Sequence, residues 1–278
     1  MALLEASGIG KNFGETHVLK DISLDLEQGE ALAIIGSSGS GKTTLLRCLN
    51  FLERPDTGVI KVNGETMWDA ADPATQKESE IRKKRLHFGL VFQNFNLFPQ
   101  YTALQNVMLA GELLAKERPE YQANKKAIHA ELEQQARELL AQMGLSERAG
   151  HYPHQLSGGM LQRIMIGIAT SMKPSLLIAD EPTTAIDAIT QFEILDELLR
   201  IKQEHQTAMV FISHDLNAIS RVADRIVVLN QGLVVDQGDF HHILHHATDS
   251  YTKLLVEKRT DVMRRYSQVL GGKECAYA

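Results

Sequence analysis

The alternation of apolar and polar residues predicts an α/β protein whose strands lie toward the two ends of the chain. Short apolar runs typical of strands alternate with stretches of helical periodicity. Strands separated by helices of this length favour a parallel sheet with helices packed on its faces. The strand-like runs are Val18–Leu26, Ala31–Ile35, Gly58–Gly64, Leu176–Ala179, Met209–Ile212 and Ile226–Leu229; the helical stretches begin at Leu45 and cover roughly Thr190–Gln203 and Asn217–Ala223.

The middle of the chain follows a different pattern. Residues 95–172 show helical periodicity throughout. One helix is predicted at roughly Ala123–Met143, closed by Gly144, and a second begins after Ser157. We therefore expect a mostly helical block inserted into an α/β core.

The composition narrows the class of protein. The chain has 278 residues, 44% hydrophobic and 23% charged, which is typical of a soluble globular protein. Its net charge of -6 offers no electrostatic reason to bind nucleic acid. Cys48 and Cys275 lie far apart, which argues against a disulfide framework or a zinc site and favours a reducing compartment. We expect no signal peptide and no membrane helix, because no apolar run approaches about 20 residues.

The strongest chemical signal directly follows the predicted strand Ala31–Ile35. It is a glycine-rich loop that fits the pattern GxxxxGK[ST] and opens a helix, a context that favours phosphate binding over a flexible turn. Glycines let backbone N–H groups point at phosphate oxygens, and the helix N-terminus adds positive potential. The lysine can neutralise β- and γ-phosphates, and the next hydroxyl can bind Mg²⁺. The loop consists of Gly36, Ser37, Ser38, Gly39, Ser40, Gly41, Lys42 and Thr43.

An acidic pair ends the predicted strand Leu176–Ala179. Asp180 is placed to hold Mg²⁺ through water, and Glu181 can polarise a water for in-line attack on a γ-phosphate. Acidic pairs after strands are also common helix-start signals, so this pair alone decides nothing.

A second candidate phosphate-binding helix start lies at Leu156–Met160. Ser157 is a plausible N-cap, and Gly158 and Gly159 expose backbone N–H groups. Taken alone, such a cap is a turn more often than a binding site.

These segments, in their order along the chain, resemble the motifs of ABC-transporter ATPase subunits. The resemblance covers about residues 3–240 without a break, and six motifs in order make chance similarity negligible. They are Walker A at residues 36–43, the Q-loop at Gln93, the LSGGQ signature at Leu156–Met160, Walker B at residues 176–181, the D-loop at residues 184–187 and the switch histidine His214.

The resemblance implies ATP as the substrate, Mg²⁺ as the cofactor and a role for each matching residue. Glu181, His214, Gln93 and Lys42 are the expected catalytic residues, and Thr43, Gln93 and Asp180 are the expected metal site. His214 would contact the γ-phosphate, and Gln93 would reach both Mg²⁺ and the attacking water.

The resemblance also implies contacts to the nucleotide from residues outside the expected catalytic set. The ring of Phe13 would stack on adenine, and Val18 and Thr44 would also contact the nucleotide. Asp187 would lie at a dimer seam. Ser157, Gly158 and Gly159 would complete the ATP site of the opposite subunit, which explains why one chain carries two phosphate-binding helix starts.

The family fold is a P-loop NTPase (RecA-like) α/β core with an antiparallel β-subdomain and an inserted α-helical subdomain. We expect residues 1–240 to form this ATPase domain, with residues 94–172 as the helical subdomain and residues 1–93 and 173–240 as the core and β-subdomain. Residues 241–278 are expected to be a helical, polar C-terminal extension. Its four histidines are more consistent with a solvated surface than with a metal site: His241, His242, His245 and His246.

Three positions depart from the common family pattern. Met160 replaces a glutamine but leaves the backbone donors of the signature intact. Ala179 replaces a bulkier residue, which affects packing only. Phe13 replaces a tyrosine, and stacking needs only the ring. None of these changes removes a catalytic group, so an active ATPase is expected.

The transported solute is less clearly indicated. Residues 51–58 and 92–99 resemble polar amino-acid importer ATPases, whereas residues 159–163 and 179–185 resemble oligopeptide and nickel importer ATPases. We favour amino acids, because the Q-loop segment faces the membrane subunits. A non-transport ABC ATPase of cell division or iron–sulfur assembly is the alternative class, and no nucleic-acid partner is expected.

An importer ATPase has a defined set of partners. We expect a second ATPase subunit, preferably an identical copy, together with integral membrane permease subunits and an extracytoplasmic solute-binding protein. The chain would then be peripheral on the cytoplasmic face of the inner membrane. Phe95, Leu97 and Phe98 are candidates to receive a permease helix, with core packing as the competing interpretation.

Overall fold

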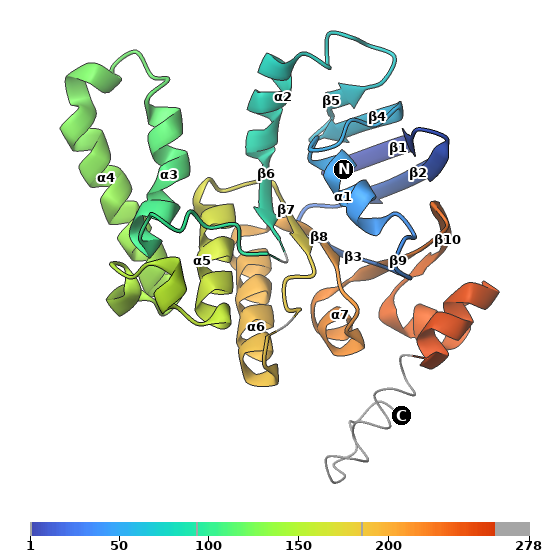
Figure 1. Cartoon of the computed structure of the whole chain (residues 1–278). Coiled ribbons are helices and arrows are strands. Elements are labelled where there is room, and N and C mark those ends of the chain that lie inside the picture. The colour runs from blue at the N-terminus through green and yellow to red at the C-terminus, as the bar shows by residue number, and fades with distance from the viewer. Residues whose placement is uncertain (1, 93, 185, 259–278) are drawn as a thin grey trace.

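The computed structural model describes residues 2–92, 94–184 and 186–258. Two sheets and a helical block form the described part of the chain (Figure 1). The helices α3 and α4 project on one side of the larger sheet, and the smaller antiparallel sheet lies on the other (Figure 1). No described helix has the length and apolar character that a bilayer-crossing segment requires.

The larger sheet has six strands in the order β10-β9-β3-β8-β7-β6. The five strands from β9 to β6 pair in parallel, as predicted, whereas β10 pairs antiparallel to β9 at one edge. Their bounds are β3 Ala31–Gly36, β6 Phe88–Val91, β7 Leu176–Asp180, β8 Ala208–Ile212, β9 Arg225–Asn230 and β10 Leu233–Gly238.

The two edge strands of this sheet were not predicted from the sequence. The strand β6 is short and contains Gly89, and β10 is only partly buried, so neither has the long apolar run of a central strand. Pairing with a neighbouring strand decides their conformation.

Alternate residues of the central strand β3 pack into two different hydrophobic cores. Ala31, Ala33 and Ile35 face the core that contains α5, α6 and α7, whereas Leu32 and Ile34 face the core that contains α1. Every residue of β3 is buried, which is the pattern expected of a strand covered on both faces. The helices are α1 Lys42–Leu49, α5 Gly158–Ser171, α6 Ala188–His205 and α7 Leu216–Val222.

The smaller sheet packs on the α1 side of the larger one. Its strand order is β2-β1-β4-β5, and the described neighbours pair antiparallel. The buried thiol of Cys48 lies in the core between the sheets. Burial raises its pKa to about 12, so Cys48 contributes to core packing and does not act as a nucleophile. The elements are β1 Leu4–Phe13, β2 Thr16–Leu26, β4 Thr57–Val62, β5 Glu65–Asp69, α2 Glu78–Lys84 and the 3₁₀ turn Arg85–His87.

The helical block contains α3 Ala103–Ala115, α4 Tyr121–Gln142 and α5. The predicted helix near Ala123–Met143 is confirmed, and Gly144 adopts a φ of 69° just after it. The prediction of helical structure throughout residues 95–172 is wrong for its first part, because the described residues between β6 and α3 form turns and bends. Buried Asn106 holds this segment by bonding the backbone of Phe98, Tyr101 and Thr102.

The C-terminal segment packs onto the core instead of leaving it. A π-helical turn, His242–His246, is followed by a helical stretch over residues 250–258. Ile243 and Val256 are buried in the same core as α6 and α7. The tail after residue 258, with Cys275, lies outside the described residues.

Contact between β6 and α5 depends on a glycine, which gives the first prediction. A Cβ atom on Gly89 would lie 2.3 Å from the carbonyl oxygen of Ala169. Gly89→Ala should therefore lower the free energy of unfolding by roughly 1–3 kcal/mol, as overpacking does. Gly150→Ala is the matched control, because a Cβ there meets no atom within 4 Å. Chemical denaturation measures both; equal stabilities of the two variants would contradict the packing argument.

Candidate nucleotide site

The register of the parallel sheet brings three functional segments to one edge. Ile34 of β3 and Asp180 of β7 both pair with Ile212 of β8, the strand between them. Carboxyl ends of parallel strands meet at the same edge of a sheet, which is where such folds bind ligands. The glycine-rich loop, the acidic pair and the His214 turn therefore begin side by side.

Glycines shape the loop after β3. A Cβ on Gly36 would lie 2.3 Å from the carbonyl oxygen of Leu229, so only glycine fits there. Gly39 and Gly41 adopt φ angles of 79° and 103°, in the left-handed region that other residues avoid. Ser37, Ser38 and Gly39 are exposed at the tip of the loop, and buried Ser40 closes it. The result is an exposed backbone cradle.

Lys42 lies across this cradle at the start of α1. Its Nζ donates to the carbonyl oxygens of Gly36 at 3.1 Å and Ser37 at 2.8 Å, and the residue is only 7% exposed. The loop therefore fixes the ammonium group at the N-terminus of a helix, where both the charge and the helix dipole attract an anion. Thr44, in the first turn of α1, is half-buried.

Thr43 and Asp180 meet through a side-chain hydrogen bond. Burial raises the pKa of the Asp180 carboxyl; the bond from Thr43 and the nearby Lys42 and Arg47 cations act in the opposite direction, and the net shift is upward. A hydroxyl and a carboxylate oxygen side by side form the type of donor set that suits Mg²⁺. The residues present thus fit the predicted metal ion.

Glu181 adopts a strained backbone conformation. Its φ is 51°, a region in which a residue other than glycine is held at a cost of roughly 1–3 kcal/mol. Its N–H donates to the carbonyl oxygen of Ile212 at 3.1 Å, which extends the β7–β8 ladder by one bond. Strain of this kind persists where the surroundings over-determine the geometry, and it clusters at functional sites.

The Glu181 carboxylate is held at both oxygens. His214 Nε2 lies 2.9 Å from Oε1, and the Thr184 hydroxyl donates to Oε2 at 2.9 Å. His214 was predicted from its motif, whereas the position of Thr184 against Glu181 was not. The structure brings two of the four predicted catalytic side chains, those of Glu181 and His214, into direct contact.

The signature turn caps α5 as predicted. Ser157 Oγ accepts a hydrogen bond from Met160 N, and a Cβ on Gly159 would lie 2.1 Å from Thr190 Cγ2 of α6. Asp187 caps α6 through Thr190 N, and this hydrogen bond lowers the pKa of its exposed carboxyl. The signature turn is therefore packed against the first turn of α6, the helix that Asp187 caps.

The signature turn and the glycine-rich loop of one chain do not share a pocket. The helix α1 packs on one face of the larger sheet and α5 on the other, so the two phosphate-binding helix starts lie apart (Figure 1).

The smaller sheet supplies a wall of the cradle. A Cβ on Gly41 would lie 3.0 Å from the carbonyl oxygen of Val18, and Gly232 of the β9–β10 turn joins Ser40 to Lys20 by backbone hydrogen bonds. Val18 therefore lies beside the loop. Phe13 lies at the hairpin end of the same sheet, 48% exposed, with Lys11 Nζ 5.3 Å from its ring centroid. Its open ring is available for stacking.

Gln93 lies outside the described residues, between β6 and the turn segment. Of the three apolar residues that follow it, Leu97 packs partly against the core and Phe98 is 48% exposed. Phe95 is half-buried, close to Gly158. The core-packing interpretation therefore holds for Leu97, and Phe98 keeps an open ring.

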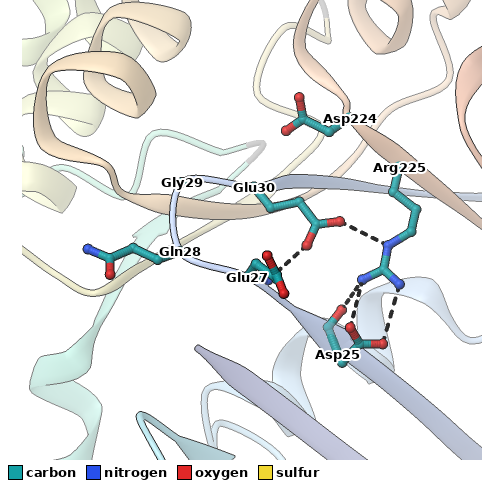
Figure 2. Close-up of a pocket in the computed structure, with 7 residues that line it drawn as sticks. All are labelled: Asp25, Glu27, Gln28, Gly29, Glu30, Asp224 and Arg225. Carbon is teal, nitrogen blue, oxygen red and sulfur yellow. Dashed lines mark hydrogen bonds and ion pairs between the residues drawn. The ribbon is translucent and has the colours of Figure 1, made fainter. Parts of the chain in front are cut away.

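One cavity of about 510 Å³ lies at the opposite end of β3 from the glycine-rich loop. Arg225 bridges two of its carboxylates, bonding Glu30 at 2.9 Å and Asp25 (Figure 2). The guanidinium is shared by the two carboxylates, so this part of the cavity has the character of a structural ion-pair network. Its lining residues are Asp25, Glu27, Gln28, Gly29, Glu30, Asp224 and Arg225.

Comparisons with known proteins agree with this geometry. The family model described as "ABC transporter" matches residues 19–184. The chain belongs to the ABC transporter family. The L-cystine transport system ATP-binding protein TcyN of Escherichia coli (strain K12) is 40% identical over 258 residues, 93% of this chain and 98% of that protein. The glutamine transport ATP-binding protein GlnQ of Escherichia coli (strain K12) is 41% identical over 237 residues, 85% of this chain and 91% of that protein.

A solved ATP-binding cassette provides the structural counterpart. It is the dimeric structure of a post-hydrolysis state bound to ADP and Pi, and it is 30% identical to this chain with a TM-score of 0.72. The match covers 85% of this chain and 98% of that one. The expected fold class and the expected ATP hydrolase activity are confirmed: this ABC ATPase binds and hydrolyses ATP.

The contact between Gly159 and Thr190 gives a prediction with a built-in rescue. Gly159→Ala should reduce the ATPase rate by about 10- to 100-fold, because the new methyl group displaces the signature turn by a fraction of an ångström or more. Adding Thr190→Ser removes the clashing Cγ2 and should restore most of the rate. Thr190→Ser alone is the control. A Gly159→Ala defect that Thr190→Ser leaves unchanged would show that this contact is not the cause.

Proposed function

We propose that this ABC ATPase powers the import of amino acids. The observation that carries the proposal is the pair of relatives at 40% and 41% identity, which are ATP-binding proteins of cystine and glutamine transport systems. Each is matched over at least 90% of its own length. No finding favours the oligopeptide, nickel, cell-division or iron–sulfur alternatives.

Glu181 is proposed to polarise the water that attacks the γ-phosphate. Each carboxylate oxygen has one polar partner and keeps a further lone pair that can accept a hydrogen bond from water, and the loss of one partner would open that oxygen fully to it. His214 is the partner that the γ-phosphate can draw away, because an imidazole N–H donates readily to a phosphate oxygen. Thr184 then keeps the carboxylate in place while Oε1 faces the water.

The phosphates are proposed to lie in the backbone cradle of residues 36–43, against the Lys42 ammonium group. Thr43 and Asp180 would hold Mg²⁺, together with Gln93. When bound, Mg²⁺ would neutralise part of the negative charge that develops on the phosphates during hydrolysis. Phe13 is proposed to stack on the adenine, next to Val18.

Two copies of the ATPase are proposed to enclose each ATP. Because α1 and α5 pack on opposite faces of the sheet, the Ser157, Gly158 and Gly159 donors would meet a nucleotide bound by another subunit. Asp187 would lie at the seam between the subunits. The structural relative was itself solved as a dimer.

The remaining partners follow from the transport role. We propose membrane permease subunits, an extracytoplasmic solute-binding protein and a peripheral position on the cytoplasmic face of the inner membrane. Residues 94–172 are proposed as the helical subdomain that meets the permease, with Phe98 at the contact. Residues 1–93 and 173–240 would form the core and β-subdomain, and residues 241–278 the C-terminal extension.

Glu181→Gln tests the chemistry. Loss of the base should reduce ATP hydrolysis by about 100- to 10,000-fold, while the neutral side chain still permits an ATP-bound dimer. Steady-state ATPase rates and size-exclusion chromatography with and without ATP measure the two effects. Glu131→Gln, on the exposed surface of α4, is the control. Unchanged hydrolysis would rule out Glu181 as the base. A variant that stays monomeric in saturating ATP would rule out the arrangement in which two subunits enclose each ATP.

Copurification and reconstitution test the transport role. A tagged full-length chain should retain integral membrane permease subunits when it is purified from detergent-solubilised membranes. In liposomes, that complex should hydrolyse ATP faster when an amino acid and its binding protein are supplied. Recovery of a soluble assembly scaffold or a division protein in place of permeases would overturn the importer proposal, without affecting the ATPase assignment.

A further inference from the structure

The C-terminal segment reaches the glycine-rich loop through one side chain. The backbone N–H of Ser37 donates to the Tyr251 hydroxyl at 2.6 Å, although the two residues are 214 positions apart. Tyr251 belongs to the helical stretch over residues 250–258, which follows β10 in the chain (Figure 1). A residue outside the recognised motifs thus contacts the phosphate cradle directly.

The Gly36–Ser37 peptide group bonds both Tyr251 and Lys42. The N–H of Ser37 and the carbonyl of Gly36 belong to the same peptide unit, and that carbonyl accepts from Lys42 Nζ at 3.1 Å. The next carbonyl, of Ser37, accepts from Lys42 Nζ at 2.8 Å and from Ser40 N at 3.2 Å. Peptide groups beside glycine turn over easily, because glycine has no Cβ to restrict them. The hydroxyl of Tyr251 therefore opposes a flip that would turn the Gly36 carbonyl away from Lys42.

Tyr251 is itself firmly positioned. Asp249 Oδ1 accepts hydrogen bonds from Tyr251 N at 2.9 Å and Thr252 N at 3.1 Å, which caps the start of this helical stretch. Thr252 is fully buried, and Tyr251 and Leu255 pack against the core. A hydroxyl on a rigid, buried support can fix the geometry of the loop that it contacts.

We propose that Tyr251 is a positioning residue of the nucleotide site. Its hydroxyl keeps the Gly36–Ser37 peptide in the orientation that retains the Lys42 ammonium group in the cradle, so the C-terminal segment sets the affinity for ATP. Tyr251 acts on the loop before ATP binds, and it has no part in the hydrolytic step. Its loss therefore weakens nucleotide binding and leaves the rate at saturation unchanged.

Tyr251→Phe tests the proposal, because it keeps the ring and removes only the hydroxyl. The Kd for a non-hydrolysable ATP analogue and the KM for ATP should both rise by about 3- to 10-fold, as expected for one lost hydrogen bond, while kcat stays the same. Amide hydrogen exchange at Ser37 should become faster. Tyr121→Phe, at the start of α4, removes a hydroxyl far from the loop and is the control.

A second variant separates positioning from general stability. Leu255→Ala loosens the packing of the same segment but leaves the Tyr251 hydroxyl in place. If Tyr251→Phe raises Kd more than Leu255→Ala does at an equal or smaller loss of Tm, the proposal stands. It is overturned if Kd follows Tm alike in both variants, if Tyr251→Phe binds ATP as tightly as the unmodified chain, or if kcat falls without a change in KM.

Discussion

The parallel pairing of β3, β8 and β7 is the constraint on which the rest of the site depends. Ile34 and Asp180 are both in register with Ile212, so three loops leave the sheet at the same level. A slip of one residue in the β7–β8 pairing would send alternate side chains to the opposite face and separate Glu181 from His214. The buried, two-sided hydrophobic packing of β7 and β8 makes such a slip unfavourable, since it would exchange residues between two cores.

The same constraint explains how the chain tolerates strain at Glu181. The residue is joined to β8 by its backbone N–H, and its carboxylate bonds His214 and Thr184. These bonds together outweigh the cost of a positive φ. The arrangement holds a carboxylate and an imidazole in direct contact at the edge of the sheet. The strained backbone of Glu181 thus fixes the position of its carboxylate.

The two faces of the larger sheet separate two glycine-containing helix starts. The helix α1, with the glycine-rich loop before it, packs on one face, and α5, with the signature turn before it, packs on the other. The close contact between Gly159 and Thr190 leaves no room between the signature turn and the first turn of α6. The C-terminal segment makes a further connection, because its Tyr251 hydroxyl bonds the Ser37 N–H of the glycine-rich loop.

The sequence by itself determined the motifs and the buried central strands. A phosphate cradle is a local structure of consecutive glycines before a helix, and the strands β3, β7, β8 and β9 are continuous apolar runs, so neighbouring residues are enough to predict them. Only the tertiary structure decided the edge strands β6 and β10, the turns before α3 and the hydrogen bond from Thr184 to Glu181. Only it could reveal the bond between Tyr251 and Ser37, because hydrogen bonds between distant segments leave no periodic trace in a sequence. Such contacts depend on which surfaces the packed core brings together.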